Sequence, residues 1–402
     1  MMARPAPEDG YELWLRYPQV DNAERLAEYR AAIQQIYFFA HTPTLVAARD
    51  ELLRGLSGLL GQPIPLVNRV TTPNALFAFT MGSVPLGAEP NDPIFQQDHF
   101  SIEFDPARGV TISAFSDVGV LYGVFHLLRH LQTHKPLVDI PVASAPKIKY
   151  RLLNHWDNLD GTIERGYAGF SLWDWHKLPD YVSSRYVDYA RACASVGING
   201  AVLNNVNAKA LSLTHGYLIK AAALANVFRP YGIRVYLSAR FSAPMELGGL
   251  SSADPLDPAV IAWWKAKADE IYALIPDFGG WMVKANSEGQ PGPGDYGRTQ
   301  ANGATLLADA LAPYGGIVHW RAFIYNSQIL DDRAKQAYAE LTPLDGQFRE
   351  NVLVQVKNGP IDFQPREPFH PLFGAMPKTN LSLEVQITQE YLGQGTHLCY
   401  LA

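Results

Sequence analysis

Three carboxylates follow segments with the composition of buried strands, and their chemistry fits the cleavage of a glycosidic bond. Glu288 ends the segment GWMVKANSE, Asp362 comes shortly after NVLVQVKNG, and Glu390 comes shortly after LSLEVQIT. Cleaving such a bond requires one protonated carboxylic acid at the leaving oxygen and another carboxylate that activates water or attacks the sugar. These three residues could supply both groups.

Three cations occupy comparable places in the sequence. Lys284 precedes Glu288 by four residues, Arg321 lies in HWRAFIY, and Lys357 lies in VQVKNG. A substrate that carries a carboxylate, such as a uronic acid, requires fixed positive charge and charge-assisted hydrogen bonds. A cation near Glu288 would also lower the pKa of this acid and oppose its role, unless the substrate's own carboxylate occupies the cation. Trp156 offers a flat face for a sugar ring.

The same charged residues fit a second interpretation, in which they form salt bridges that serve only the structure. The sequence leaves this alternative open for each of the six. Glu384 shows the ambiguity, because it alternates with apolar neighbours in a predicted strand, where it either points into a barrel or pairs with a cation. Glu367 lies in a Pro-rich loop.

The elements that must position these residues repeat along the second part of the chain. From Tyr150 onward, a short apolar segment that ends in polar residues is followed by a loop and a helical stretch. The seven predicted strands are 150–158, 198–206, 233–240, 280–288, 316–325, 351–359 and 381–388. Seven such units in a row favour a (β/α)8 barrel of the TIM type over an open sheet, with its active site at the carboxyl ends of the strands.

The residues after the seventh predicted strand are too few for another complete unit. Parallel neighbours require a crossover of about a dozen residues. We therefore expect residues 141–402 to form a barrel with about seven of its eight strands, incomplete at its C-terminal side.

Residues 1–140 are predicted to form a small α/β domain that precedes the barrel. We expect a strand at GYELWLRY, one long amphipathic stretch from Ala23 to Leu60, strands at HFSIEF and GVTISAF, and a second helix from Gly119 to His134. The segment KPLVDIPVASAPKIKY is expected to be an extended connector.

Composition excludes several classes of protein. The 33 basic and 39 acidic residues give a net charge of −6 without long runs of one sign, so no nucleic-acid or membrane partner is indicated. The two cysteines, Cys193 and Cys399, are too few for a disulfide framework. Because the N-terminus has no apolar run of signal-peptide length, we expect a cytoplasmic protein.

His126, His130 and His134 have a spacing that superficially suits a metal. The Glu of an HExxH site is absent, so an ordinary helix face is the better interpretation and no metal site is predicted.

Several long motifs resemble those of one enzyme family. These are LLNHWDNLDGTIERGYAGFSLWDW, KANSEGQPGPGDYGR, HWRAFIYN, VQVKNGPIDFQPREPFHPLFGAMPKTN and VQITQEYLGQGTH. The sequence resembles the α-glucuronidases of glycoside hydrolase family 67 over essentially the whole chain. The resemblance implies an inverting hydrolase, with no metal or organic cofactor. It would remove α-1,2-linked glucuronic acid, or its 4-O-methyl ether, from glucuronoxylan-derived oligosaccharides (aldouronic acids).

The resemblance also implies a role for each candidate residue. Glu288 in NSEGQ matches the general acid, and Asp362 in GPIDF and Glu390 in TQEYL match two carboxylates that share the activation of water. Lys284, Arg321 and Lys357 match positions that contact the uronate, and Trp156 matches a wall of its pocket. Inversion predicts about 6.5–9.5 Å between the acid and the bases. The family carries a C-terminal helical region that supports homodimers in some members, and this sequence ends before it.

Three other functions remain open on the sequence. The chain could be an inactive fragment or pseudoenzyme that binds acidic sugar, because an incomplete barrel exposes the edges of its outer strands. It could be another barrel hydrolase that processes uronates or hexosamines. A non-catalytic interaction protein is the third, supported only by the incomplete barrel.

Overall fold

The computed structural model describes residues 9–81, 98–166, 169–325, 331–359 and 368–386. The chain divides into two compact units, which we describe in turn. Unit 1 comprises residues 1–151, 183–199 and 226–233, and unit 2 comprises residues 152–182, 200–225 and 234–402. The predicted division at residue 140 stays a prediction.

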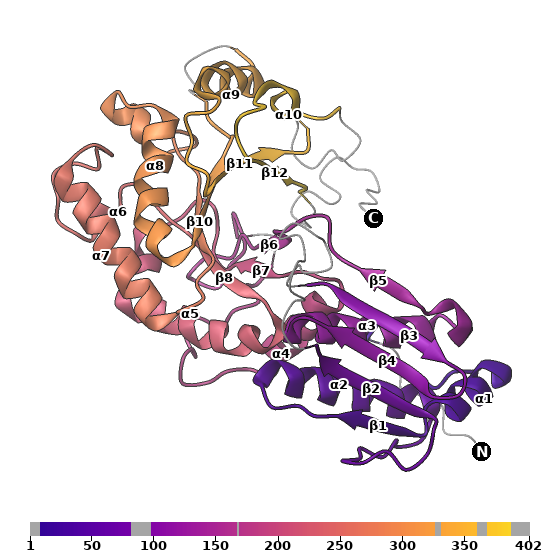
Figure 1. The fold of residues 1–402 in the computed structure, drawn as a ribbon. Helices are drawn as coiled ribbons and strands as arrows, with labels where there is room; N and C mark the ends of the chain where they lie inside the picture. Colours follow the sequence, from indigo (N-terminus) through magenta and orange to yellow (C-terminus); the bar gives the residue numbers. More distant parts are fainter. Residues whose placement is uncertain (1–8, 82–97, 167–168, 326–330, 360–367, 387–402) are drawn as a thin grey trace. The chain divides into compact units, whose positions relative to one another are not determined.

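Unit 1 contains a mixed sheet of five strands in the order β1-β2-β4-β3-β5 (Figure 1). The strands are β1 (Gln35–Phe38), β2 (Ala75–Thr80), β3 (Phe100–Asp105), β4 (Gly109–Ala114) and β5 (Val142–Ser144). β2 pairs in parallel with β1 and β4, whereas β3 is antiparallel to β4 and β5. This mixed sheet confirms the α/β class predicted for the N-terminal domain.

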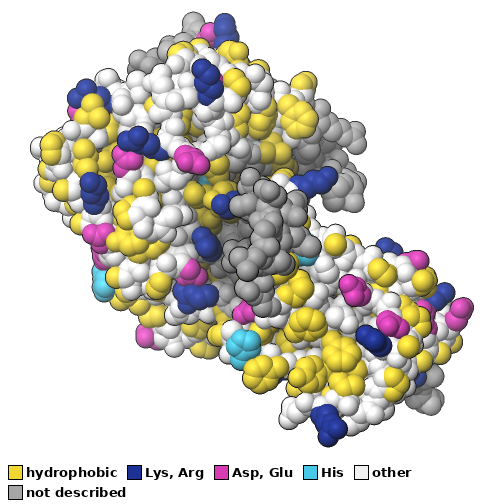
Figure 2. All heavy atoms as spheres, in the orientation of Figure 1, with side chains coloured by type: hydrophobic (Ala, Val, Ile, Leu, Met, Phe, Trp, Pro, Cys, Tyr) yellow, Lys and Arg dark blue, Asp and Glu magenta, His cyan; other side chains and the backbone are white. Residues whose placement is uncertain are grey.

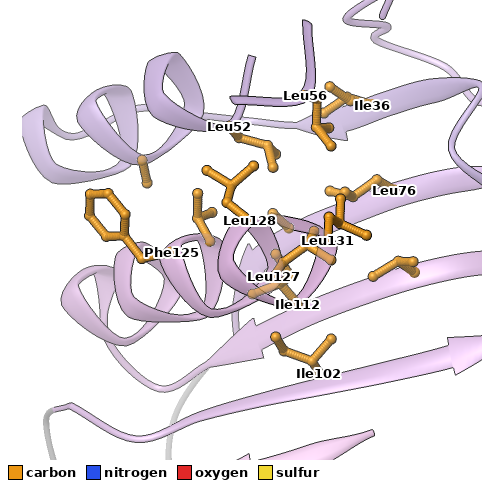
Figure 3. Packing of buried hydrophobic residues seen from close by; sticks show 14 of the residues in the cluster. Ile36, Leu52, Leu56, Leu76, Ile102, Ile112, Phe125, Leu127, Leu128 and Leu131 are labelled. Atoms are coloured by element: carbon orange, nitrogen blue, oxygen red, sulfur yellow. The ribbon is translucent and has the colours of Figure 1, made fainter. Parts of the chain in front are cut away.

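Helices pack on this sheet through rows of leucines. The helices of unit 1 are α1 (Ala23–Ala32), α2 (Pro43–Leu60), α3 (Asp117–Gln132) and α4 (Arg185–Ser195). Side-chain oxygens of Thr42 and Ser116 accept backbone N–H groups at the starts of α2 and α3, which is the usual N-cap arrangement. Figure 3 shows Leu52 of α2 and Leu128 of α3 between the two helices, in the same buried cluster as Ile36 and Leu76 of the sheet. Burial of this apolar surface stabilises the unit.

A buried ion pair ties α4 to α2 within unit 1. The guanidinium of Arg191 donates to both carboxylate oxygens of Glu51, at 2.7 and 3.0 Å, and Tyr17 donates its hydroxyl to the same carboxylate at 2.6 Å. Because Glu51 is buried, these three bonds satisfy a charge that would otherwise be costly to remove from water.

Three predictions for this unit were wrong or incomplete. The segment GYELWLRY forms turns over residues 11–14, not a strand, and its Leu15 and Tyr17 are buried. The stretch from Ala23 to Leu60 is not continuous, because residues 35–38 form strand β1, which pairs with β2 and separates α1 from α2. The expected connector contains strand β5, which pairs with β3.

Unit 2 contains seven parallel strands, and each strand from β7 onward is hydrogen-bonded to the strand before it in the sequence. They are β6 (Leu152–Asn154), β7 (Gly200–Val202), β8 (Arg234–Ser238), β9 (Gly280–Val283), β10 (Ile317–Arg321), β11 (Val352–Lys357) and β12 (Leu381–Glu384). All seven lie within the predicted segments. The strands form a curled parallel sheet with helices between them in the chain (Figure 1), which confirms a partial barrel of the TIM type.

The helices that connect the strands of this sheet alternate with them along the chain, as the repeat predicted. Between β7 and β12 they are α5 (His215–Phe228), α6 (Ala243–Glu246), α7 (Pro258–Leu274), α8 (Gln300–Leu311), α9 (Arg333–Leu341) and α10 (Leu372–Ala375). All residues of β9 and β10 are buried, as expected for parallel strands covered on both faces. None of the helices in the described ranges combines the length and apolarity needed to cross a bilayer.

Gly280 shows how closely neighbouring strands approach. Its φ angle is +138°, and a Cβ atom at this position would lie 1.8 Å from the carbonyl oxygen of Ile317. Only glycine fits here, because both the backbone conformation and the contact exclude a side chain.

Charged side chains are interspersed on the molecular face drawn in Figure 2, with basic and acidic groups side by side. This face carries no patch of one sign among the side chains that the structure describes, which agrees with the even charge distribution in the sequence.

Candidate active site

The carboxyl ends of neighbouring strands in unit 2 bring most of the described candidate residues to one edge of the sheet. Arg321, Lys357 and Glu384 are the last residues of β10, β11 and β12, and Lys284 directly follows β9. The register pairs Arg321 with Gln355 and Lys357 with Glu384, so these side chains start from adjacent positions. The sheet therefore places the three predicted cations on consecutive strands.

Lys284 and Glu288 form an ion pair. The ammonium group of Lys284 donates to Glu288 Oε2 and, at 2.7 Å, to Asn207 Oδ1. The Lys284 side chain is 2% exposed and that of Glu288 is 31% exposed. Glu288 adopts a φ angle of +49°, which is uncommon for a residue with a side chain and is found more often at functional sites. The carboxylate thus remains accessible while its partner is buried.

The charges around Glu288 favour its ionised form and therefore oppose its role as a general acid. Partial burial by itself would raise the pKa of Glu288, but the hydrogen bond and charge of Lys284, with Lys357 and Arg165, outweigh it and lower the pKa below its usual range. Burial also lowers the pKa of Lys284, although the bond to Glu288 acts in the opposite direction. In the ligand-free protein Glu288 is therefore a carboxylate at neutral pH.

All three cations surround the ring of Phe323. The ammonium nitrogen of Lys357 lies 3.6 Å from the ring centroid, that of Lys284 lies at 5.3 Å, and the guanidinium carbon of Arg321 lies at 6.0 Å. A cation is attracted to the face of an aromatic ring at such distances. Phe323 therefore serves as a common platform for charges that would otherwise repel each other. This role was not predicted from the sequence.

Arg321 is paired with Glu384. Its guanidinium donates to both carboxylate oxygens of Glu384 at 2.7–3.2 Å, and Nε also donates to Gln355 Oε1 at 3.1 Å. Both charged residues are buried. This pair realises one of the two interpretations left open for Glu384, namely pairing with a cation.

Trp156 lies after β6, between the half-buried His155 and the buried Asp157. It is half-buried, and its carbonyl accepts the N–H of Glu164 at 2.8 Å. Burial lowers the pKa of the neighbouring His155, against the opposing charge of Asp157. Asp157 accepts hydrogen bonds from Ser171 Oγ and the N–H of Leu172 at 2.5 and 2.8 Å. These bonds fix the loop that carries Trp156.

Asp362 and Glu390 lie outside the described residues. Their roles, and the separation of 6.5–9.5 Å that inversion requires between acid and base, stay predictions.

A cluster of amides on the loops after β6 and β7 was not predicted. Asn205 donates its amide hydrogens to Glu164 Oε2 at 2.7 Å and Asn158 Oδ1 at 3.0 Å, and Asn207 donates to Glu164 Oε1 at 3.4 Å. The segment LNNV ends the second predicted strand, so its asparagines could have been proposed by the reasoning that selected the charged residues.

His126, His130 and His134, whose spacing superficially suited a metal, all lie in unit 1. His130 Nε2 is 2.9 Å from the carbonyl of Pro136, the ring of His126 lies against Phe100, and His134 lies beyond the end of α3. In the described part of the chain, no three His, Cys, Asp or Glu residues are grouped so that they could hold a metal ion.

Comparison with protein families accounts for nearly the whole chain. Residues 13–127 match the model described as "Glycosyl hydrolase family 67 N-terminus", and residues 130–402 match "Glycosyl hydrolase family 67 middle domain". The chain belongs to glycoside hydrolase family 67. The resemblance inferred from its motifs is therefore confirmed.

Curated relatives in family 67 carry matching names. "Alpha-glucuronidase A" of Emericella nidulans is 42% identical over 413 residues, which cover 98% of this chain and 48% of the relative. "Alpha-glucuronidase" of Hypocrea jecorina is 41% identical over 411 residues, with the same two coverages. The chain thus spans about half the length of the curated relatives that it matches.

A solved structure supports the fold alone. A "GH138 enzyme targeting pectin rhamnogalacturonan II" aligns with a TM-score of 0.50 and 16% identity, over 81% of this chain and 38% of the other.

Proposed function

We propose that this family 67 chain takes part in the removal of α-1,2-linked glucuronic acid, or its 4-O-methyl ether, from xylooligosaccharides, with inversion at the anomeric carbon. In this proposal Glu288 is the general acid, and Asp362 and Glu390 activate water. The uronate carboxylate is bound by Lys284, Arg321 and Lys357, and Trp156 forms a wall of the pocket beside the sugar ring. The observation that carries the proposal is the accessible Glu288 carboxylate beside three cations gathered around Phe323.

A charged substrate resolves the conflict between Glu288 and its neighbours. While Lys284 is paired with Glu288, the acid is ionised and cannot protonate a leaving oxygen. When the uronate carboxylate takes the ammonium group, Glu288 loses its main stabilising partner and its pKa rises toward the range that a general acid requires. Binding of the substrate charge would therefore prepare the acid.

Glu288 then delivers its proton to the glycosidic oxygen as the bond to the anomeric carbon breaks. Water deprotonated by the base carboxylates attacks from the opposite face, so both halves of the reaction need a carboxyl group. The leaving xylooligosaccharide keeps the proton of the acid. The base then releases to solvent the proton that it took from water, and Glu288 takes up one from solvent, which restores both groups.

The test is hydrolysis of an aldouronic acid by the 402-residue chain, followed by proton NMR. An inverting reaction on the α-linkage releases β-glucuronate first, before mutarotation. Glu288→Gln is expected to lower kcat by about 10²–10⁴-fold, the usual contribution of a general acid. Release of the α-anomer, or full activity in this variant, would contradict the proposal.

Binding of an acidic sugar without turnover is the second candidate. The observation that favours it is the pairing of Arg321 with Glu384 and of Lys284 with Glu288. In the ligand-free protein these two cations already have carboxylate partners, and one of these partners is the proposed acid. A chain that binds glucuronate in calorimetry but releases none from an aldouronic acid would support this function over the first.

A further inference from the structure

We propose that Glu164 is a positioning residue that acts through Asn207 to hold Lys284 in place for an anionic sugar. The inference deepens the proposed function and rests on it. Glu164 belongs to the loop after β6, Asn207 to the loop after β7, and Lys284 directly follows β9. Three separate parts of the chain are thus linked to one ammonium group.

Hydrogen bonding fixes the orientation of the Asn207 side chain. Its Oδ1 accepts from Lys284 at 2.7 Å, while its Nδ2 faces Glu164 Oε1 at 3.4 Å. An ionised carboxylate only accepts and an ammonium group only donates, so no other orientation of the amide satisfies both neighbours. Glu164 therefore determines that Asn207 presents an acceptor to Lys284.

Glu164 is itself firmly held. Its side chain is 8% exposed, its φ angle is +48°, and Asn205 donates to its other oxygen at 2.7 Å. The largely exposed Arg165 lies 3.8 Å from Glu164 Oε1. Such a carboxylate is kept in place by the loop that carries it and by Asn205.

The charges facing Lys284 show why a second anion is needed. Glu288 and Glu164 favour its ammonium form, Arg321 disfavours it, and Lys357 shares the Phe323 ring with it. Burial has the largest effect and, like Arg321, lowers the pKa of Lys284. If Lys284 exchanges Glu288 for a substrate carboxylate, Glu164 and Asn207 are the neighbours that remain in place and keep the ammonium group charged and oriented.

The experiment follows Lys284 directly, so that it does not depend on catalysis. The 402-residue protein is labelled with ¹³Cε-lysine, the Lys284 signal is assigned by its loss in Lys284→Met, and its titration is recorded without ligand. Glu164→Gln is expected to shift the titration down by about one pH unit, which is a tenfold change in proton affinity. Asn207→Asp, which places an anion next to the ammonium group, is expected to shift it up.

Asp160→Asn is the matched control, because Asp160 lies on the same loop and is exposed, and its side chain holds Thr162 and not Asn207. This variant reproduces any loosening of the loop and is expected to leave the Lys284 titration unchanged. Equal titrations for wild type and Glu164→Gln, or an equal shift in Asp160→Asn, would overturn the inference. If Glu164→Gln does not fold, as judged by circular dichroism, a downward or absent shift in Asn207→Asp overturns it instead.

A second measurement separates this inference from the proposed function. Calorimetric binding of sodium glucuronate to wild type is recorded from neutral to alkaline pH, with glucose as the uncharged comparison. In Glu164→Gln the loss of glucuronate affinity is expected at a pH about one unit lower than in wild type. Failure of wild type to bind glucuronate would count against the proposed function, whereas the Lys284 titration alone would still decide the role of Glu164.

Discussion

Arg321 holds Glu384 through three hydrogen bonds from its guanidinium to the two carboxylate oxygens. The two residues end strands β10 and β12, which are separated by β11, so the pair crosses one intervening strand. Gln355 of β11 accepts a further bond from Arg321 at 3.1 Å and joins the three strands. This link stabilises the edge of the sheet in the described residues and at the same time occupies a cation proposed to bind substrate.

Glu384→Leu is expected to destabilise the protein by about 3–5 kcal/mol, because it leaves the buried charge of Arg321 without its partner. The measurement is urea denaturation monitored by tryptophan fluorescence. The double variant Arg321→Met with Glu384→Leu should recover most of this loss, since an apolar pair of similar size avoids the desolvation cost. Equal losses in the single and double variants would show that packing, not charge, is decisive.

The ion pair of Glu288 predicts how stability depends on pH. Because the folded protein lowers the pKa of Glu288 below its ordinary value of 4.5, the pair contributes stability above that pH, which is lost as pH falls through the lower folded value. Glu288→Gln should therefore be less stable than wild type at neutral pH and equally stable in strong acid. Thermal unfolding from pH 7 to pH 2.5 tests this, and a difference that stays constant across the range would contradict it.

Phe323→Leu is expected to weaken the binding of glucuronate about two- to fivefold, because Lys284, Arg321 and Lys357 lose the ring face that holds them together. Calorimetry with sodium glucuronate measures the effect. Phe369→Leu is the matched control, since that ring is 70% exposed and packs near Phe373. An equal effect of the two substitutions would remove the special role of Phe323.

Gly280→Ala is expected to cost clearly more stability than Gly315→Ala. Both glycines have positive φ angles, so both substitutions carry the strain of an unfavourable backbone conformation, about 1–2 kcal/mol. Only at Gly280 would the new Cβ meet a neighbouring backbone atom, Ile317 O at 1.8 Å, whereas nothing lies within 4 Å at Gly315. Denaturant unfolding of the two variants compares them, and equal losses would mean that β10 moves aside without cost.

The sequence predicted the sheet of unit 2 better than that of unit 1, for a physical reason. In unit 2 the inner strands are short, mostly buried apolar runs, and each strand is separated from the next by a helix, so composition and spacing reveal them. In unit 1 the strand ALFAFT was not predicted, and GYELWLRY has the composition of a strand but finds no neighbour to pair with in the described residues. Whether such a segment forms a strand depends on pairing partners far along the chain, and the local sequence pattern carries no information about those partners.

The candidate site shows the same limit. Strand-end reasoning found Lys284, Arg321, Lys357 and Glu288, because parallel strands bring their carboxyl ends together. It could not predict that Arg321 pairs with Glu384, because this pair depends on how far the two side chains extend across β11. Phe323 was not predicted, because an apolar residue after a strand does not indicate a functional role until the positions of the surrounding cations are known.

The order of the strands in unit 2 also has a consequence for folding during synthesis of the chain. Each strand from β7 to β12 pairs with the strand that left the ribosome just before it, so the growing sheet always offers a finished edge to the next segment. Pairing between neighbours in the sequence requires smaller loops to close than pairing between distant strands would, and so keeps the entropy cost of each contact lower. The charged residues at the strand ends arrive in the same sequence, from Lys284 to Glu384, so the cations are assembled one at a time as translation proceeds.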